Sequence, residues 1–227
     1  MQRLSKVGLI LAAGGTGTRF GADIPKQFLP LDDRPLYLHA LVRFSGFVDE
    51  VVVVAPATWI ERVEREVTGR IPEALTVVAG GGSRQSSVER GLLALSTSID
   101  YVLVHDAARP FTSRDLIATV IEGMRRFEAC IPVLPVRDTV KELANGAVVR
   151  TIPRETLGLA QTPQGFHAPL LRRAVLQAQT DHFHGTDEAS LVEHLGARVR
   201  VVPGDPDNIK VTWSQDLPEL TPPPELS

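Results

Sequence analysis

The sequence predicts an α/β fold: a Rossmann-like, mostly parallel β-sheet with helices on both faces, plus a protruding β-hairpin arm. Two observations predict the sheet and its helices. The first is a set of short apolar runs that suit strands buried on both faces. The second is that these runs alternate with segments of roughly 10–15 residues at helical spacing, as in βαβ units. A third observation predicts the arm. Between residues 136 and 160 this alternation stops, and two β-prone segments flank an Asn-Gly turn.

The first predicted strand, residues 7–11, runs directly into a series of small residues at 12–17. Glycine and alanine let the backbone approach a ligand closely and turn its amides outward as anion donors. Two cations, Arg19 and Lys26, follow this loop. A strand, a bare amide loop and two positive charges indicate a polyphosphate site. The same residues are also consistent with a tight turn that binds no ligand and leaves both cations solvated.

Two common phosphate-binding loops do not match these residues. A Walker loop closes with Gly-Lys-Ser or Gly-Lys-Thr, which this loop lacks. A dinucleotide-binding loop needs Gly-x-Gly-x-x-Gly, and after Gly15 and Gly17 the third position is Phe20. The loop therefore indicates phosphate binding of another kind.

The sequence pattern also predicts the remaining helices and strands. Helical spacing predicts helices over residues 36–44, 58–67, 83 onward, 114–123, 169–179 and 186–195, with Thr58 as the N-cap of the second. Apolar or β-branched runs predict strands over residues 50–55, 75–79, 101–105, 130–134 and 198–202. Residues 207–212 are expected to form a loop followed by a strand.

The arm is predicted from residues 136–143 and 146–152, which read as two extended segments around Ala144-Asn145-Gly146. A hairpin inserted into an α/β sheet must pack against something. We therefore expect the arm to cross onto a partner subunit.

Composition limits the classes of partner and location. A net charge of −3 gives no electrostatic reason to expect a nucleic-acid partner. No apolar stretch approaches the ~18–20 residues of a membrane span, so no membrane association is expected. The one cysteine, Cys130, lies in an apolar run and is expected to be buried. We expect a cytoplasmic protein.

Three polar or glycine-rich segments each follow a predicted strand: residues 14–26, 80–87 and 105–110. In open α/β sheets, ligands bind beyond the carboxyl ends of the strands, so these segments should meet at one edge. The three glycines at 80–82 suit a flat base lying on backbone, with Ser87 supplying a hydroxyl; alternatively they only form a turn and cap a helix. Asp106 is a hard oxygen ligand placed where Mg²⁺ on a triphosphate would lie, or else it closes a turn by pairing with Arg109.

Several motifs then carry a resemblance to a known family. They are Ala-Ala-Gly-Gly-Thr-Gly-Thr-Arg-Phe-Gly at 12–21, Pro-Lys-Gln-Phe-Leu at 25–29, His-Asp-Ala-Ala-Arg-Pro at 105–110, Val-Arg-Asp-Thr-Val-Lys at 136–141, Gln-Thr-Pro-Gln at 161–164, Thr-Asp-Glu-Ala at 186–189 and Asp-Asn-Ile-Lys-Val-Thr at 207–212. In this order, over nearly the whole chain, they resemble the 2-C-methyl-D-erythritol 4-phosphate cytidylyltransferase family of the non-mevalonate isoprenoid pathway. The resemblance implies one nucleotidyltransferase domain over residues 1–227, with residues 136–160 as a dimerisation arm.

The resemblance implies that CTP and 2-C-methyl-D-erythritol 4-phosphate react to give 4-diphosphocytidyl-2-C-methyl-D-erythritol and pyrophosphate, with Mg²⁺ as cofactor. Arg19 and Lys26 would act on the α-phosphate and leaving pyrophosphate. Arg154 and Lys210 would hold the polyol phosphate. Thr-Asp-Glu-Ala would cap a helix. The nucleotide pocket would comprise Ala12, Ala13, Gly14, Gly81, Ser87, Asp106 and Ala107, the acceptor site would include Thr139, Arg109 and Thr162, and Asp106 would serve the metal.

Because Thr139 and Arg154 lie in the predicted arm, they are expected to reach the neighbouring site of a homodimer. Two other functions stay open at this point. One is a cytidylyltransferase for another polyol phosphate, such as ribitol 5-phosphate, since Pro-Lys-Gln-Phe and Asp-Asn-Ile-Lys occur there too. The other is a nucleotide-binding regulator without catalysis, against which the intact Arg19, Lys26, Asp106 and Lys210 argue.

Overall fold

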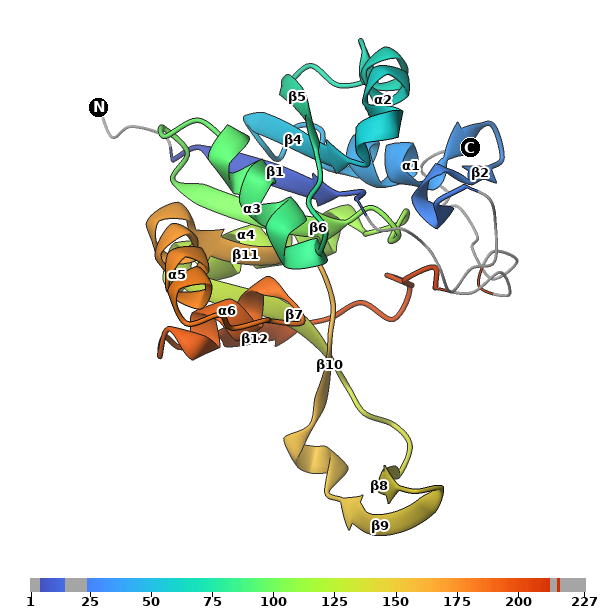
Figure 1. The fold of residues 1–227 in the computed structure, drawn as a ribbon, viewed down its shortest axis with the longest axis vertical. Coiled ribbons are helices and arrows are strands. Elements are labelled where there is room, and N and C mark those ends of the chain that lie inside the picture. Colours follow the sequence, from blue (N-terminus) through green and yellow to red (C-terminus); the bar gives the residue numbers. More distant parts are fainter. Residues whose placement is uncertain (1–4, 15–23, 213–215, 217–227) are drawn as a thin grey trace.

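The computed structural model describes residues 5–14, 24–212 and 216. Its central sheet has eight strands, in the order β10-β7-β11-β6-β1-β4-β5 with β12 added beside β7 (Figure 1). The strands are β1 (Val7–Ala12), β4 (Glu50–Ala55), β5 (Ala74–Ala79), β6 (Tyr101–Asp106), β7 (Ala129–Pro135), β10 (Gly158–Ala160), β11 (Gln164–His167) and β12 (Arg200–Pro203).

Six α-helices accompany the sheet in the described part of the chain: α1 (Leu36–Arg43), α2 (Ile60–Val67), α3 (Arg84–Ala94), α4 (Arg114–Arg126), α5 (Ala168–Thr180) and α6 (Glu188–His194). Among the residues that are described, none of the helices is both long and apolar enough to span a membrane. The smaller elements are the 3₁₀ turns η1 (Lys26–Phe28), η2 (Ala57–Trp59) and η3 (Arg154–Thr156), and the hairpins β2 (Pro30–Leu31) with β3 (Arg34–Pro35) and β8 (Val140–Ala144) with β9 (Ala147–Ile152).

The sheet is mostly parallel, as predicted. Strands β5, β4, β1 and β6 are parallel neighbours, and β12 runs parallel to β7. Strands β10 and β11, which the sequence did not predict, are antiparallel to β7, and β11 is also antiparallel to β6. They are short and contain glycine, so they lack the β-branched runs that reveal the other strands.

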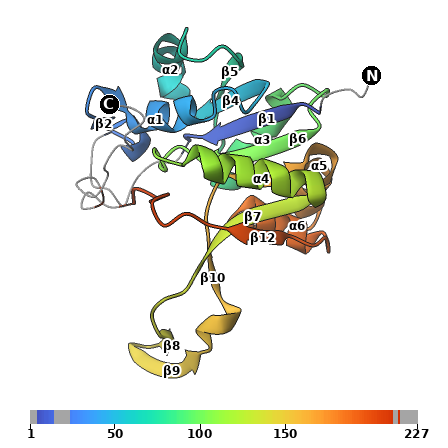
Figure 2. The ribbon, with the colours of Figure 1, turned by 180° about the vertical axis from the view of Figure 1, so that it is seen from behind.

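Helices cover both faces of the sheet, which also confirms the prediction. Side chains on one face of the strands, such as Leu9 and Val53, pack with α1, α2 and α4 in one apolar core. Side chains on the other face, such as Ile10 and Val54, pack with α3, α5 and α6 in a second core. Figure 2, seen from behind, shows α4 lying across the first of these faces. Two buried faces explain why the central strands are continuous apolar runs.

Two local predictions are wrong. Thr58 is not an N-cap, because Pro56 begins a 3₁₀ turn in which the Trp59 amide donates to the Pro56 carbonyl, and α2 starts only at Ile60. Residues 207–212 form no strand. Their contacts run instead to side chains and loop backbone, including a hydrogen bond from the Val211 amide to the Ala108 carbonyl.

The predicted hairpin is present as β8 and β9, which extend away from the sheet (Figure 1). Its turn is the expected one: Asn145 has φ 51° and Gly146 has φ 77°, the left-handed values that an Asn-Gly hairpin turn requires. The chain leaves the sheet after β7 and rejoins it at β10, so the protruding part covers residues 136–157, and the last three residues of the predicted arm belong to the sheet. Cys130 is buried in β7, also as predicted, and burial raises the pKa of its thiol to about 12.

Candidate functional site

The carboxyl ends of the central parallel strands are joined by backbone hydrogen bonds. The Ala107 amide, just after β6, donates to the carbonyl of Ala12 at the end of β1. The Ala13 amide donates to the carbonyl of Val54 in β4, and the Gly80 amide donates to the carbonyl of Ala55. The three segments that follow these strands therefore begin side by side at one edge of the sheet, as the sequence predicts.

Two glycines, Gly14 after β1 and Gly80 after β5, allow the backbone to approach helix α3 closely. A β-carbon on Gly14 would lie 3.1 Å from the Ser87 Oγ, and one on Gly80 would lie 3.0 Å from the same atom. The buried Ser87 hydroxyl donates to the Ser83 carbonyl and accepts a hydrogen bond from the Gly81 amide. Ser87 thus joins the glycine segment to α3, while Ser83 caps this helix through a capping box.

Lys26 lies on a turn that aromatic packing holds in place. The Phe28 ring stacks on Trp59 at 4.2 Å between centroids and meets the edge of Tyr37 at 5.4 Å. The neighbouring Gln27 side chain donates to the Ala13 carbonyl in the first loop. From this anchored turn, the Lys26 ammonium donates to the Val211 carbonyl at 2.6 Å. The first loop and the 207–212 segment therefore meet around Lys26.

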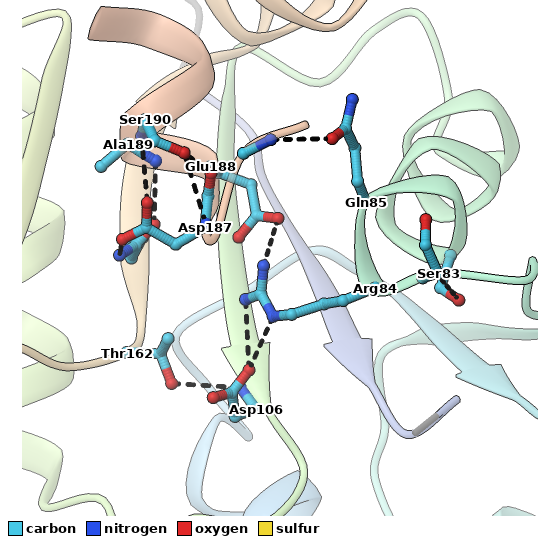
Figure 3. A network of polar contacts seen from close by, with 12 residues as sticks. Ser83, Arg84, Gln85, Asp106, Thr162, Asp187, Glu188, Ala189 and Ser190 are labelled. Atoms are coloured by element: carbon cyan, nitrogen blue, oxygen red, sulfur yellow. Dashed lines mark hydrogen bonds and ion pairs between the residues drawn. The ribbon is translucent and has the colours of Figure 1, made fainter. Parts of the chain in front are cut away.

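Asp106 lies between two cations at the end of β6. Its Oδ2 accepts a hydrogen bond from the Lys210 ammonium at 2.6 Å. Its Oδ1 lies 3.1 Å from Arg84 Nη2 (Figure 3). Burial alone would raise the pKa of this carboxyl, but Arg84 and Lys210 together lower it well below its usual range. Asp106 is therefore ionised at neutral pH.

The alternative pairing of Asp106 with Arg109 is not the one observed. The Arg109 guanidinium donates to the Asn208 carbonyl at 2.6 Å and so fastens the 207–212 segment to the end of β6. Arg109 still lies close enough to Asp106 to contribute to its lowered pKa. Burial lowers the pKa of Arg109 itself.

Behind Asp106 lies a buried polar network centred on His105. The Thr162 hydroxyl accepts from the Asp106 amide at 3.1 Å and lies 3.1 Å from His105 Nδ1, while His105 Nε2 contacts the Arg109 carbonyl. The simplest assignment places the imidazole proton on Nε2, with Nδ1 accepting from Thr162. Burial lowers the pKa of His105 to about 4, so the ring is neutral. Thr162, expected beside the acceptor, thus also fixes the backbone of Asp106.

The predicted site residues fall into three groups. The structure gathers most of them at this edge: Ala12, Ala13, Gly14, Lys26, Gly81, Ser87, Asp106, Ala107, Arg109, Thr162 and Lys210. It places two of them on the arm, where Thr139 precedes β8 and Arg154 opens η3. Arg19 lies outside the described residues.

Comparison with known proteins identifies the family of this chain. A sequence model of the 2-C-methyl-D-erythritol 4-phosphate cytidylyltransferase family matches residues 7–220, nearly the whole chain. The chain belongs to this family. It is 46% identical over 225 residues to the 2-C-methyl-D-erythritol 4-phosphate cytidylyltransferase of Acidobacterium capsulatum, covering 93% of this chain and 94% of that protein.

Solved structures of the cytidylyltransferase family share the fold. The enzyme from Thermus thermophilus superposes with a TM-score of 0.78 at 38% identity, covering 94% of this chain and 96% of that one. The 4-diphosphocytidyl-2C-methyl-D-erythritol synthase from Anaerococcus prevotii superposes with a TM-score of 0.83 at 27% identity, covering 95% and 96%. The predicted family resemblance is therefore confirmed, and with it the class of enzyme, a nucleotidyltransferase.

Sequence reasoning missed two charged residues of the site. Arg84 donates to Glu188 Oε1 at 2.6 Å while also contacting Asp106, so it bridges two carboxylates (Figure 3). Its position directly after the glycine triplet and Ser83 could have identified Arg84 as a candidate site residue. Glu188 gave no such signal, because the cap alone explains the Thr-Asp-Glu-Ala motif. The motif does cap α6, as predicted, and its N-cap residue is Asp187.

Proposed function

We propose that this chain transfers the cytidylyl group of CTP to 2-C-methyl-D-erythritol 4-phosphate, giving 4-diphosphocytidyl-2-C-methyl-D-erythritol and pyrophosphate in isoprenoid precursor biosynthesis. Membership of the family supports the substrates. The observation that carries the proposal is the meeting of Lys26, Arg84 and Lys210 around Asp106 and residues 207–212. We also infer that the enzyme works in the cytoplasm, where its nucleotide substrate is made.

The chemistry needs fixed positive charge more than a protein nucleophile. A phosphate oxygen of the acceptor attacks the α-phosphorus of CTP in line, the bond from that phosphorus to the bridging oxygen breaks, and pyrophosphate leaves with its electron pair. Two anions must approach each other, and charge grows on the leaving group. Cations that are already in place stabilise this transition state without reorganisation.

The residues divide these tasks by position. Lys26, with Arg19, would face the α-phosphate and pyrophosphate, since both follow the first loop in the sequence. Lys210 would hold the acceptor phosphate. Its ammonium pairs with Asp106 in the unliganded chain and its side chain is 41% exposed, so an incoming phosphate can reach it.

The residues at this edge fit Mg²⁺ bound to a triphosphate. Among the residues that the structure describes, no three His, Cys, Asp or Glu side chains are grouped to hold a metal. Mg²⁺ commonly takes only one or two carboxylates and completes its shell with water and substrate phosphates, and Asp106 is an ionised carboxylate beside the cationic cluster. We propose Asp106 as that ligand. When bound, Mg²⁺ would neutralise charge on the triphosphate.

The proposed reaction is tested by pyrophosphate release from CTP and Mg²⁺ with each acceptor. We expect release with 2-C-methyl-D-erythritol 4-phosphate and at least about tenfold less with ribitol 5-phosphate, a difference of about 1.4 kcal/mol in transition-state stabilisation. Equal or greater release with ribitol 5-phosphate would move the assignment to another polyol. CTP binding without release from either acceptor would indicate a regulator.

We further propose that the arm completes the site of a second subunit. Two features support a homodimer: Thr139 and Arg154 lie on the arm, and the arm exposes Leu143, Val148 and Val149. A two-stranded hairpin with exposed aliphatic side chains is marginal by itself and is stabilised by packing.

Mixed dimers test the crossing. Arg154→Ala and Arg19→Ala protomers are each expected to be nearly inactive. If the arm crosses, a heterodimer has one site with both arginines intact and regains up to about half of the wild-type activity per mixed dimer. No recovery after confirmed subunit exchange would refute the crossing. Exchange itself is checked by native mass spectrometry of differently tagged protomers.

A further inference from the structure

Glu188 is a buried acid with few partners. Its side chain is 1% exposed, and its Oε1 accepts from Arg84 Nη1 at 2.6 Å. Within the described chain, its other oxygen, Oε2, is buried without a hydrogen-bond partner. Burial raises the pKa of this carboxyl even though Arg84 opposes the shift. Keeping a half-satisfied carboxylate in the interior costs free energy, so helix capping, which Asp187 already provides, does not account for it.

Glu188 ends a row of four alternating charges. In order they are Lys210, Asp106, Arg84 and Glu188, joined at 2.6, 3.1 and 2.6 Å. The side chains at the two ends differ in exposure: Lys210 is 41% exposed and Glu188 is 1% exposed. The Lys210 end of the row can therefore exchange with an incoming phosphate, whereas the Glu188 end cannot.

We propose that Glu188 is a positioning residue: through Arg84, it holds the Asp106 carboxylate in place when Lys210 leaves it for a substrate phosphate. The inference rests on the proposed function, because it assigns that exchange to Lys210. Without Glu188, Arg84 would have Asp106 as its one remaining carboxylate partner in the row and would itself be free to turn toward the triphosphate. Asp106 would then lose its fixed direction.

The geometry at both ends of Arg84 supports this role. The planar guanidinium directs Nη1 to Glu188 and Nε and Nη2 to Asp106, so that both carboxylates are reached at once (Figure 3). A lysine ammonium in this position could not span the two in the same way. The backbone beside Glu188 is also fixed, because Gln164 donates to the Asp187 carboxylate and accepts from the Ala189 amide.

The test is Glu188→Gln, which keeps the shape and removes the charge. Calorimetry measures CTP affinity with Mg²⁺ and with EDTA. We expect the variant to lose about tenfold in affinity with Mg²⁺ and to change little with EDTA, as for other residues that orient a metal ligand. In the assay, kcat should fall by about 10- to 100-fold, while KM for the polyol phosphate stays within about threefold.

Glu122→Gln is the matched control, because Glu122 pairs with Arg126 on the exposed side of α4. It should match the wild type in every readout. Arg84→Lys provides a second test with the charge retained, and it should reproduce the loss of Mg²⁺-dependent affinity. Thermal unfolding of each variant reports folding separately.

Two results would overturn the positioning role. One is an unchanged ratio of CTP affinities with and without Mg²⁺ in a folded Glu188→Gln variant. The other is a loss of CTP affinity that is equal with Mg²⁺ and with EDTA and is accompanied by a lower Tm. A purely structural role would produce this result. If the wild type itself shows no Mg²⁺-dependent CTP binding and no pyrophosphate release, the proposed function fails together with this inference.

Discussion

The sheet edge and the arm carry parts of the same predicted site in opposite environments. At the edge, Asp106 is 8% exposed and Thr162 is 4% exposed, and both are tied to neighbouring segments by hydrogen bonds. On the arm, Leu143 is 66% exposed and Val148 is 60% exposed. The edge is thus assembled within one chain, whereas the arm presents apolar and cationic side chains that remain exposed in the described part of its own chain. This contrast underlies the proposal that the arm contributes to the site of a second subunit.

The largest effect is expected at the edge. Lys210→Ala removes a cation that is proposed to hold the acceptor phosphate, and it should lower kcat/KM by about 10²–10³. Lys6→Ala, the same change on an exposed residue just before β1, is the control and should leave kcat/KM within about twofold. Steady-state pyrophosphate release measures both. A loss of kcat/KM smaller than about fivefold in Lys210→Ala would contradict the proposal that fixed positive charge at this edge drives the reaction.

Substitutions in the arm should instead make the activity depend on protein concentration. Leu143 and Val148 are directly opposed across β8 and β9, so they lie on one face. Burying a side chain such as Leu143 is worth about 1.5 kcal/mol, and a substitution changes both arms of a homodimer, so Leu143→Ser should weaken the dimer by about 100-fold. Analytical ultracentrifugation measures the dissociation constant, and activity should fall only below it. If the wild-type protein is monomeric at micromolar concentration, the proposed role of the arm in a dimer is refuted.

Acid should destabilise the edge through His105. The pKa of this buried ring is lowered to about 4, so the unfolded chain, with an ordinary value near 6.5, binds the proton first as pH falls. Stability is therefore fully present above about pH 6.5 and is lost on acidification, by about 3 kcal/mol at pH 4.5. Urea unfolding at both pH values measures this loss. His105→Gln should abolish most of the dependence, and a His105→Gln variant as acid-sensitive as the wild type would exclude His105 as its source.

The smallest effect is expected at the tip of the arm. Asn145 has φ 51°, so Asn145→Ala strains the turn by about 1 kcal/mol. Because β8 and β9 pair with each other as a separate two-stranded sheet, the strain should raise amide exchange within the arm and leave the global Tm of the monomer unchanged. Hydrogen exchange with mass spectrometry separates the two. A Tm lowered by several degrees would show that the arm and the body unfold as one unit.

The sequence predicted the parts of the molecule that depend on local pattern. Apolar runs such as Val51 to Val54, buried on both sides, identify central strands, and Asn145-Gly146 identifies the hairpin turn. The convergence of Lys26, Asp106 and Lys210 also followed from their places after strands and in the family motifs. Partners chosen in three dimensions could not be predicted in this way.

Arg84 illustrates that limit. It pairs with Asp106, 22 positions away, and with Glu188, 104 positions away, and no local pattern joins the three. For the same reason, the strand expected within residues 207–212 does not form. Two side chains distant in sequence, Arg109 and Gln161, instead donate to the Asn208 carbonyl of this segment, in place of a strand ladder.

The edge around Asp106 is proposed to bind a triphosphate with its own cations, and a crystal structure of the chain with CTP and Mg²⁺ would test this proposal. We expect the phosphates to lie against the first loop, within hydrogen-bond distance of Arg19 and Lys26, with Lys210 facing them. A triphosphate bound elsewhere, or these three side chains pointing to unrelated surfaces with CTP bound, would refute the proposed site.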